Sequence, residues 1–351
     1  MRRSARPVGR LHHLSAVRLG SLRMKLIPQS QLGLGLEPPP RSLPVLEEKS
    51  RGTRFRALEV RRVLNSPATT NMGFWSLNPY VGCEFGCSYC YARKTHEWTV
   101  ERAGGLTDPP TGRPADSASD RFEHEILVKH GAPDVLLRTL EPGKLAGAEL
   151  VIGTATDPYQ PAERRFLLTR KLLEALLLHR GLAIGLITKS PLIARDLDVL
   201  TQLARQHELT VNLSIASLDA ALLRRFEARS PAPHARIRAL ARLTRGGIHA
   251  GLMIAPILPG ITDSWTGLAA LMEAGRDAGA RFAIGYPLRL GPAARSGYLP
   301  VLEREFPELL SRYRERYGTR DHAGRDYEAA LARRLRTLQQ AFGFPVGSKR
   351  G

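Results

Sequence analysis

Residues 78–93 read Asn-Pro-Tyr-Val-Gly-Cys-Glu-Phe-Gly-Cys-Ser-Tyr-Cys-Tyr-Ala-Arg, and this stretch contains all three cysteines of the 351-residue chain. The cysteines are Cys83, Cys87 and Cys90, with the spacing C-x3-C-x2-C. An odd number of thiols packed this closely does not build a disulfide framework, and thiolates kept for a metal indicate a reducing compartment. Three thiolates can bind three irons of a cubane and leave the fourth iron open for a ligand, whereas four would close the cluster.

Three other interpretations of the cysteines are open. A structural zinc site normally takes a fourth Cys or His, and His96 could supply it, although C-x3-C-x2-C-x5-H is not a usual zinc spacing. A redox pair would use Cys87 and Cys90 and leave Cys83 without a role. Inert core cysteines would not be expected to cluster in one short segment. We favour the iron–sulfur cluster, because the motif follows a predicted strand, as a site at the mouth of a barrel requires.

Short apolar runs alternate with helix-like stretches on the C-terminal side of the cysteines. The runs from residue 149 onward start about 25–40 residues apart, the length of a βα unit. A helix is predicted at Glu163–His179, between the first two of these runs. Six strands alternating with helices predict an α/β fold, in which a parallel sheet is wound into a partial or complete barrel with its chemistry at the carboxyl ends of the strands. The predicted strands are 77–81, 149–155, 183–188, 209–215, 248–255 and 281–287.

The regions on either side of this pattern differ from it in composition. Residues 1–53 are basic and contain a Pro-Pro-Pro run, so we expect a partly disordered arm, with Met1 and Met24 as alternative starts. Residues 54–290 form the predicted barrel. Residues 291–351 are charged and helical in pattern and predict a C-terminal helical extension. Its closing helix has an apolar face made of Leu331, Leu335, Leu338 and Phe342.

The chain is strongly basic, with a formal net charge of +19. Such an excess favours a polyanionic partner, with nucleic acid as the first candidate. Because arginine is scattered through every segment, solvated surface arginines explain the charge equally well. No run of about 18 apolar residues predicts a membrane span. The acid-free N-terminus could be a transit peptide or a loose arm, and we expect a cytoplasmic protein without a membrane partner.

The cysteine motif and several later stretches resemble the radical S-adenosylmethionine (AdoMet) superfamily, in particular the branch that contains spore photoproduct lyase and its uncharacterised relatives. The resemblance covers about residues 55–345. It implies a partial (β/α)6 TIM-like barrel and a 4Fe–4S cluster held by Cys83, Cys87 and Cys90. The stretches that carry it are 78–83, 90–93, 153–160, 187–190, 213–215 and 255–260.

The resemblance also implies an activity. AdoMet would chelate the open iron, and its reductive cleavage would give methionine and a 5′-deoxyadenosyl radical that abstracts hydrogen from a substrate that the sequence does not identify. An external electron donor of the flavodoxin or ferredoxin type would supply the electron. A nucleic-acid substrate, as in DNA repair or RNA modification, is the alternative that the charge of +19 favours. A non-enzymatic nucleic-acid-binding protein with a structural metal is the alternative from another class.

The residues that the resemblance places near AdoMet lie at successive strand ends and in the segment 82–91, which carries the three cysteines and is called the cysteine loop below. Lys189 would place its ammonium group on the methionine carboxylate. Each polar residue also has a purely structural interpretation: Thr156 could cap a helix, Lys189 could be solvated, and Ser214 could pair with backbone. The full set of implied AdoMet-binding residues is Tyr89, Thr156, Lys189, Ser214, Ala255, Pro256 and Ile257.

The sequence departs from the lyase at one informative position. The lyase returns a hydrogen atom from a fourth cysteine, and the matching residue here is Thr154, in a chain that has no fourth cysteine. A hydroxyl group is a far poorer hydrogen-atom donor than a thiol, so we do not expect efficient repair of the lyase's DNA lesion. Tyr91 directly follows Cys90, where the lyase has a tyrosine implicated in hydrogen transfer, and is the remaining candidate catalytic residue. It could equally pack against the cysteine loop.

Overall fold

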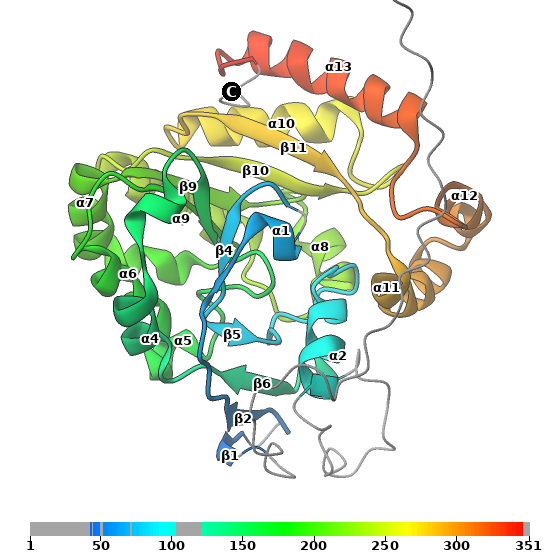
Figure 1. Cartoon of the computed structure of the whole chain (residues 1–351). Helices are drawn as coiled ribbons and strands as arrows, with labels where there is room; N and C mark the ends of the chain where they lie inside the picture. Colours follow the sequence, from blue (N-terminus) through cyan, green and yellow to red (C-terminus); the bar gives the residue numbers. More distant parts are fainter. Residues whose placement is uncertain (1–42, 44, 50–51, 71, 103–120, 347–351) are drawn as a thin grey trace, which may run out of the picture. The chain divides into compact units, whose positions relative to one another are not determined.

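Six parallel strands form a curved sheet in which the order of the strands follows the chain (Figure 1). The computed structural model describes residues 43, 45–49, 52–70, 72–102 and 121–346. A short strand, β3 (Leu64–Asn65), pairs antiparallel with the first parallel strand, and β11 forms the opposite edge, so the described sheet is open. This is the partial barrel that the sequence predicts. Its parallel strands are β4 (Trp75–Leu77), β7 (Glu149–Ile152), β8 (Ala183–Thr188), β9 (Glu208–Ser214), β10 (Ala250–Ile257) and β11 (Ala283–Pro287).

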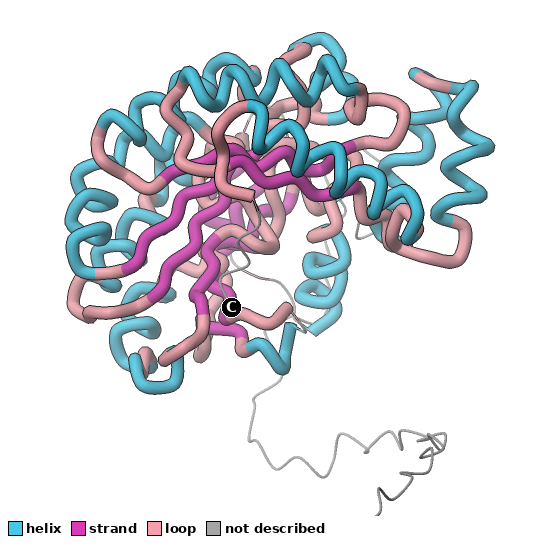
Figure 2. Tube along the Cα trace, turned by 90° about the horizontal axis from the view of Figure 1, so that it is seen from above, coloured by secondary structure: helices cyan, strands magenta, loops and turns pink. Residues whose placement is uncertain are grey.

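Helices lie around the outer side of this sheet, as Figure 2 shows from above. Each presents an apolar stripe to the strands, and α6 for example buries residues 168, 172, 173 and 176. The predicted closing helix is confirmed as α13, which packs on α10 and β11 and buries Leu331, Leu335 and Leu338. The helices are α1 (Pro67–Thr70), α2 (Arg93–Arg102), α4 (Ala132–Thr139), α5 (Glu163–Phe166), α6 (Leu168–Leu176), α7 (Leu197–Gln206), α8 (Ala220–Phe226), α9 (Pro233–Arg245), α10 (Trp265–Asp277), α11 (Pro292–Glu305), α12 (Pro307–Tyr317) and α13 (Arg325–Ala341), with 3-10 turns η2 (Pro142–Leu145) and η3 (Pro191–Asp196).

A second, smaller sheet lies beside the cysteine loop. Its order is β1 (Val45–Glu48), β2 (Arg54–Ala57), β6 (Glu125–Val128) and β5 (Tyr80–Val81). Inside it, the buried Arg56 guanidinium donates to the Glu125 carboxylate over 2.7 Å, so the two charges compensate each other. The arm predicted for residues 1–53 thus contains a strand at its C-terminal end, whereas residues 1–42 lie outside the described part. All described residues belong to one compact unit that begins at Pro40.

Two predicted elements are each divided in the structure. The predicted strand 77–81 is wrong as one element, because it separates into β4 and β5, which belong to different sheets. Pro79 lies at the division, where it has no N–H group to continue a ladder. The predicted helix Glu163–His179 is divided into α5 and α6 at Leu167, whose φ is +52°. The Glu163 carboxylate accepts a hydrogen bond of 2.8 Å from the backbone N–H of Thr169 and so caps the second helix.

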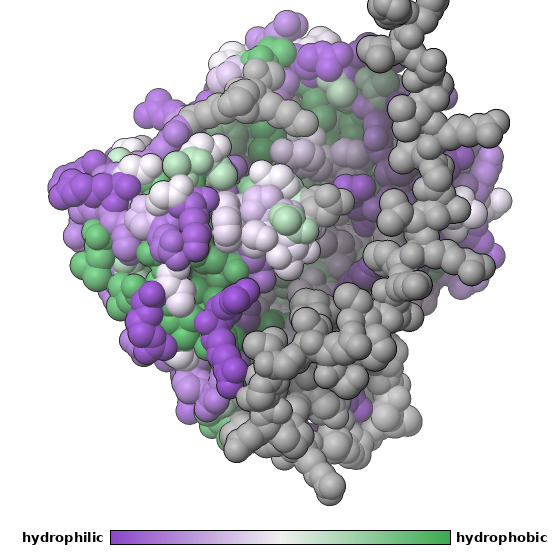
Figure 3. Space-filling view, viewed as in Figure 1, coloured by the Kyte–Doolittle hydropathy of each residue, from purple (hydrophilic) through white to green (hydrophobic). Residues whose placement is uncertain are grey.

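The visible surface carries both hydrophilic and hydrophobic side chains. Figure 3 shows hydrophilic residues beside smaller hydrophobic areas over the helices of the left-hand side. No helix among the described residues is long and apolar enough to cross a membrane.

Candidate active site

The cysteine loop leaves β5 through a glycine that no other residue could replace without displacement. Gly82 has φ of +89°, and a Cβ atom there would lie 2.8 Å from the carbonyl oxygen of Phe122. That same carbonyl accepts a hydrogen bond of 2.9 Å from the backbone N–H of Cys83. The buried Gln160 braces the loop, since its side chain donates to the Gly82 carbonyl over 3.2 Å and accepts from the Glu84 N–H over 2.9 Å.

The three thiols lie in one poorly hydrated loop. Cys83 and Cys87 are buried and Cys90 is half-buried. Burial raises the pKa of the Cys87 thiol to about 12 and also raises the pKa values of Cys83 and Cys90. Repulsion from a neighbouring acid or thiolate adds to each raised value, so a bound cation would favour the thiolate forms. Soft sulfur ligands around such a cation fit an iron–sulfur cluster.

A cubane and a single zinc ion make different demands on the three cysteines. Within the described ranges, no group of three His, Cys, Asp or Glu side chains is arranged to hold one metal ion. Cysteines of a cubane each bind a different iron, so their sulfurs need not surround one point. The imidazole of His96, the suggested fourth zinc ligand, lies 2.9 Å from the Glu125 carbonyl through Nε2 and packs edge-on against Phe122.

Lys189 connects the ends of β8 and β9 to the cysteine loop. Its Nζ lies 3.3 Å from Ser214 Oγ and 3.1 Å from the Tyr89 hydroxyl. It also forms a 2.8 Å ion pair with Glu227, which is itself 1% exposed and paired with the buried Arg236. Lys189 is therefore a half-buried member of a network and not a solvated lysine. The trio of Lys189, Glu227 and Arg236 carries a net charge of +1.

The segment after α8 holds this network against the cysteines. Cys87 and Glu227 form an isolated antiparallel bridge, beside which the backbone N–H of Ser88 donates to the Phe226 carbonyl over 2.8 Å. The sulfur of Cys87 lies 3.6 Å from the Ser230 hydroxyl. Although burial raises it, the pKa of Glu227 is lowered to about 2 by Lys189 and Arg236, so the carboxylate is ionised. Tyr89 donates its hydroxyl proton to this carboxylate.

Thr156, in the loop after β7, contacts the cysteine loop and does not cap a helix. Its hydroxyl donates to the Gly82 carbonyl over 2.6 Å and accepts from the Gln160 amide over 3.0 Å. The next residue, Asp157, accepts 2.7 Å and 2.6 Å bonds from the Lys189 N–H and the Thr188 hydroxyl. Burial raises the pKa of Asp157 and so opposes its charged form. This pair joins the loop after β7 to both the cysteines and β8.

The β10 residues are divided between the network and the core. The Ser214 hydroxyl donates to the Ala255 carbonyl over 2.9 Å, which brings Ala255 to the Lys189 network. Pro256 is half-buried. The side chain of Ile257 is fully buried in the apolar cluster shared with α10 and α13, so only its backbone is available to a ligand at the strand ends.

Tyr91 and Thr154 meet at the mouth, beside the end of β4. The Tyr91 hydroxyl donates to the Thr154 backbone carbonyl, and about half of the Tyr91 surface is exposed, at 54%. The Thr154 hydroxyl accepts a 3.0 Å bond from the amide of Asn78, whose own oxygen accepts from the Ala155 N–H over 2.8 Å. Tyr91 is thus an accessible hydroxyl, whereas Thr154 is buried.

Four residues of this site were not among the predicted ones. Asp157 and Gln160 belong to the matched stretch 153–160 and could have been found there. No sequence pattern marks Glu227 or Arg236, because only the fold brings Glu227 to Lys189 and Arg236 to Glu227.

Comparison with known proteins agrees with this arrangement. The model of the radical SAM superfamily matches residues 77–271. An uncharacterised protein of Mycobacterium tuberculosis (strain ATCC 25618 / H37Rv) is 32% identical over 289 residues, which cover 82% of this chain and 80% of that protein. An uncharacterised protein of Methanocaldococcus jannaschii is 28% identical over 187 residues, 53% of this chain and 61% of that protein.

Solved structures of spore photoproduct lyase share the fold. One mutant superposes with a TM-score of 0.58 at 16% identity, over 82% of this chain and 79% of the lyase. Another, with bound AdoMet and dinucleoside spore photoproduct, gives a TM-score of 0.57 at 17% identity over the same shares. Identity this low shows the fold alone. The match over residues 77–271, the shared fold and the three cysteines together identify the chain as an enzyme that belongs to the radical SAM superfamily.

Proposed function

We propose that Cys83, Cys87 and Cys90 hold a 4Fe–4S cluster at which this enzyme cleaves AdoMet, and that Tyr89, Thr156, Lys189, Ser214 and the backbone of 255–257 form the AdoMet site. The observation that supports this most strongly is that Lys189 Nζ lies 3.1 Å from the Tyr89 hydroxyl and 3.3 Å from the Ser214 hydroxyl, next to Glu227, which forms the bridge with Cys87. When bound, the cluster supplies an electron and an open iron, so that AdoMet yields methionine and a 5′-deoxyadenosyl radical able to abstract hydrogen.

The charges around Lys189 suit the methionine carboxylate of AdoMet. The trio of Lys189, Glu227 and Arg236 carries a net positive charge, and Glu227 and Arg236 are almost fully buried. A carboxylate that approaches Lys189 would receive a charge-assisted hydrogen bond and complete the charge balance. Glu227 holds Lys189 and Tyr89 in position for this contact, and Thr156 supports the cysteine loop through Gly82.

The substrate is a separate question: our first hypothesis leaves it unidentified, and nucleic acid is the alternative. The charge of +19 supports nucleic acid, and so does the dinucleoside spore photoproduct that a lyase of the same fold binds. The buried and hydrogen-bonded Thr154 hydroxyl argues against the lyase's own reaction, because it offers no thiol for hydrogen return. Membership of an enzyme superfamily excludes the non-enzymatic alternative.

Metal analysis of cysteine variants tests the cluster assignment. Anaerobically reconstituted wild type should contain iron and acid-labile sulfide in equal amounts, and Cys83→Ala, Cys87→Ala and Cys90→Ala should each lose most of both. A variant that retains the full iron and sulfide content would remove that residue from the ligand set. Zinc without sulfide in the wild type would overturn the assignment.

A further inference from the structure

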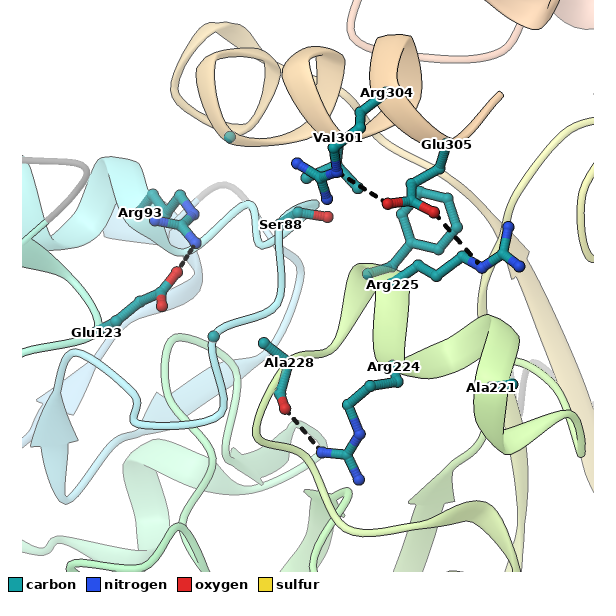
Figure 4. Close-up of a pocket in the computed structure, with 13 residues that line it drawn as sticks. Ser88, Arg93, Glu123, Ala221, Arg224, Arg225, Ala228, Val301, Arg304 and Glu305 are labelled. Carbon is teal, nitrogen blue, oxygen red and sulfur yellow. Dashed lines mark hydrogen bonds and ion pairs between the residues drawn. The ribbon is translucent and has the colours of Figure 1, made fainter. Parts of the chain in front are cut away.

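A cavity of about 490 Å³ lies between the cysteine loop, α8 and α11 (Figure 4). Around the Cys87–Glu227 bridge, Glu227 pairs with Lys189, whereas the residues on either side of Cys87 and Glu227 line the cavity. These neighbours are Gly86, Ser88, Phe226 and Ala228. The cavity therefore lies directly beside the part of the cysteine loop that carries Cys87.

The cavity is rich in arginine. Four arginines and two glutamates line it, which leaves a formal excess of +2. Arg224 is exposed and donates to the Ala228 carbonyl over 2.7 Å, with no carboxylate at ion-pair distance in the described part of the chain. Arg225 and Arg304 share the single carboxylate of Glu305. Figure 4 shows these side chains, which come from α8 and α11, around the same opening.

The proposed function requires an electron from outside the chain. All three cysteines lie in one loop, so no further cysteine is present to hold a second iron–sulfur cluster as a relay. An electron carrier must then approach the cysteine loop itself, where it reaches the surface. The lining by Gly86 and Ser88 makes the cavity such a place.

We propose that this arginine-lined cavity is the docking surface for an acidic one-electron carrier protein of the flavodoxin or ferredoxin class; the proposal rests on the proposed function. At this surface one electron moves from the carrier, which is oxidised, to the cluster, which is reduced, and no covalent bond changes. Complementary charge steers such an encounter and raises its rate at low salt.

A protein suits this surface better than a nucleic acid. Glu123 and Glu305 lie among the arginines, and the phosphates of a nucleic acid would be repelled by both. A protein surface can offer carboxylates to the arginines and hydrogen-bond donors to these two glutamates. Glu123 is also fixed in place, since it pairs with Arg93 and Arg229 at the rim.

Charge reversal at the rim tests the proposal. The variant Arg224→Glu/Arg304→Glu changes two exposed arginines that do not touch the Lys189 network. Its control, Arg333→Glu/Arg336→Glu, makes the same change in net charge on exposed residues of α13. Each chain is reconstituted with its cluster, and its iron content is measured. Its affinity is measured for an acidic flavodoxin, for a ferredoxin and for duplex DNA. The rate of cluster bleaching is measured with each reduced carrier and with dithionite.

In the cavity variant, both the affinity for the carrier and the rate of cluster reduction by the carrier should be at least about tenfold lower than in the wild type. Its iron content and its rate of reduction by dithionite should be normal. The control should stay within about twofold. The docking surface would be overturned if the wild type and the cavity variant were reduced at equal rates, or if both variants lost affinity equally. It would also be overturned if neither carrier bound the wild type, or if the cavity variant lost affinity for duplex DNA in place of affinity for the carrier. A wild type without a cluster would instead remove the proposed function on which it rests.

Discussion

Lys189 is the residue on which AdoMet affinity should depend most. The variant Lys189→Ala removes the ammonium group that lies beside Ser214 and Tyr89 while leaving the cysteine ligands intact. Loss of one charge-assisted hydrogen bond costs about 1.5–3 kcal/mol, so the affinity should fall about ten- to hundredfold. Equilibrium binding of AdoMet to cluster-loaded protein measures this. Lys144→Ala, at an exposed surface pair, is the matched control, and unchanged affinity in Lys189→Ala would return Lys189 to a structural role.

Glu227 should give the fold a stability that depends on pH. Burial opposes its charge, yet Lys189 and Arg236 lower its pKa to about 2, below the value of about 4.3 expected in the unfolded chain. The ion pairs therefore stabilise the fold fully above that higher value, and the stabilisation is lost as the pH falls toward 2. Breaking a buried pair typically costs about 3–5 kcal/mol, so Glu227→Gln should lower the free energy of unfolding by about this amount at pH 7.

The difference between wild type and Glu227→Gln should then shrink between about pH 5 and pH 2. Urea unfolding of iron-free protein across this range measures it. Glu303→Gln, at an exposed pair with Arg314, should change little at any pH. A gap between wild type and Glu227→Gln that is the same at every pH would show that the carboxylate charge is not what stabilises the fold.

Hydrogen return is the third property that a single residue decides. The wild type should not repair spore photoproduct efficiently, because every cysteine is assigned to iron and Thr154 presents a hydroxyl bonded to Asn78. Thr154→Cys should raise any weak repair, since it places a thiol at the donor position. Tyr91→Phe keeps the ring and removes the accessible hydroxyl, so it should matter only if Tyr91 transfers hydrogen. The anaerobic assay uses dinucleotide spore photoproduct and reads out dithymidine; clean multiple-turnover repair by the wild type contradicts the prediction.

At the scale of elements, the turn from β5 into the cysteine loop should be the least tolerant of change. Gly82→Ala adds a Cβ atom 2.8 Å from the Phe122 carbonyl, in a left-handed conformation that alone costs about 1–2 kcal/mol. Gly147→Ala has the same backbone strain, at φ of +74°, with no atom within 4 Å. We expect Gly82→Ala to lower both the melting temperature and the iron content well beyond Gly147→Ala. Equal effects would show that the contact with Phe122 is unimportant.

The elements also show what sequence can predict. The strand β8 matches its predicted residues 183–188, because its apolar run ends in Thr188-Lys189 and is preceded by a turn at Gly181. The division of β4 from β5 was missed because the apolar pattern continues through Pro79, while the division depends on pairing with two different sheets. The division of α5 from α6 depends on the buried carboxylate of Glu163, which periodicity does not reveal.

Over the whole molecule, the sequence directs attention to the cysteine loop and to positions at or just after strand ends, but not to the segment after α8. Lys189 and Ser214 end parallel strands, which meet at one edge of a sheet. Glu227 lies 38 residues after Lys189 and approaches it only because the segment after α8 pairs with the cysteine loop. Ile257 shows the converse: a strand-end position predicts nearness to the mouth but not the direction of a side chain, which here points into the core.

Formation of 5′-deoxyadenosine tests the central claim most directly. Cluster-loaded protein is incubated anaerobically with AdoMet and dithionite, and 5′-deoxyadenosine and methionine are quantified by chromatography. The wild type should form both products in equal amounts and only with reductant, while Cys87→Ala should form neither. The same assay without any added substrate suffices, because the proposed cleavage precedes hydrogen abstraction. A wild type that carries a full, reducible cluster and binds AdoMet but forms no 5′-deoxyadenosine would contradict the account.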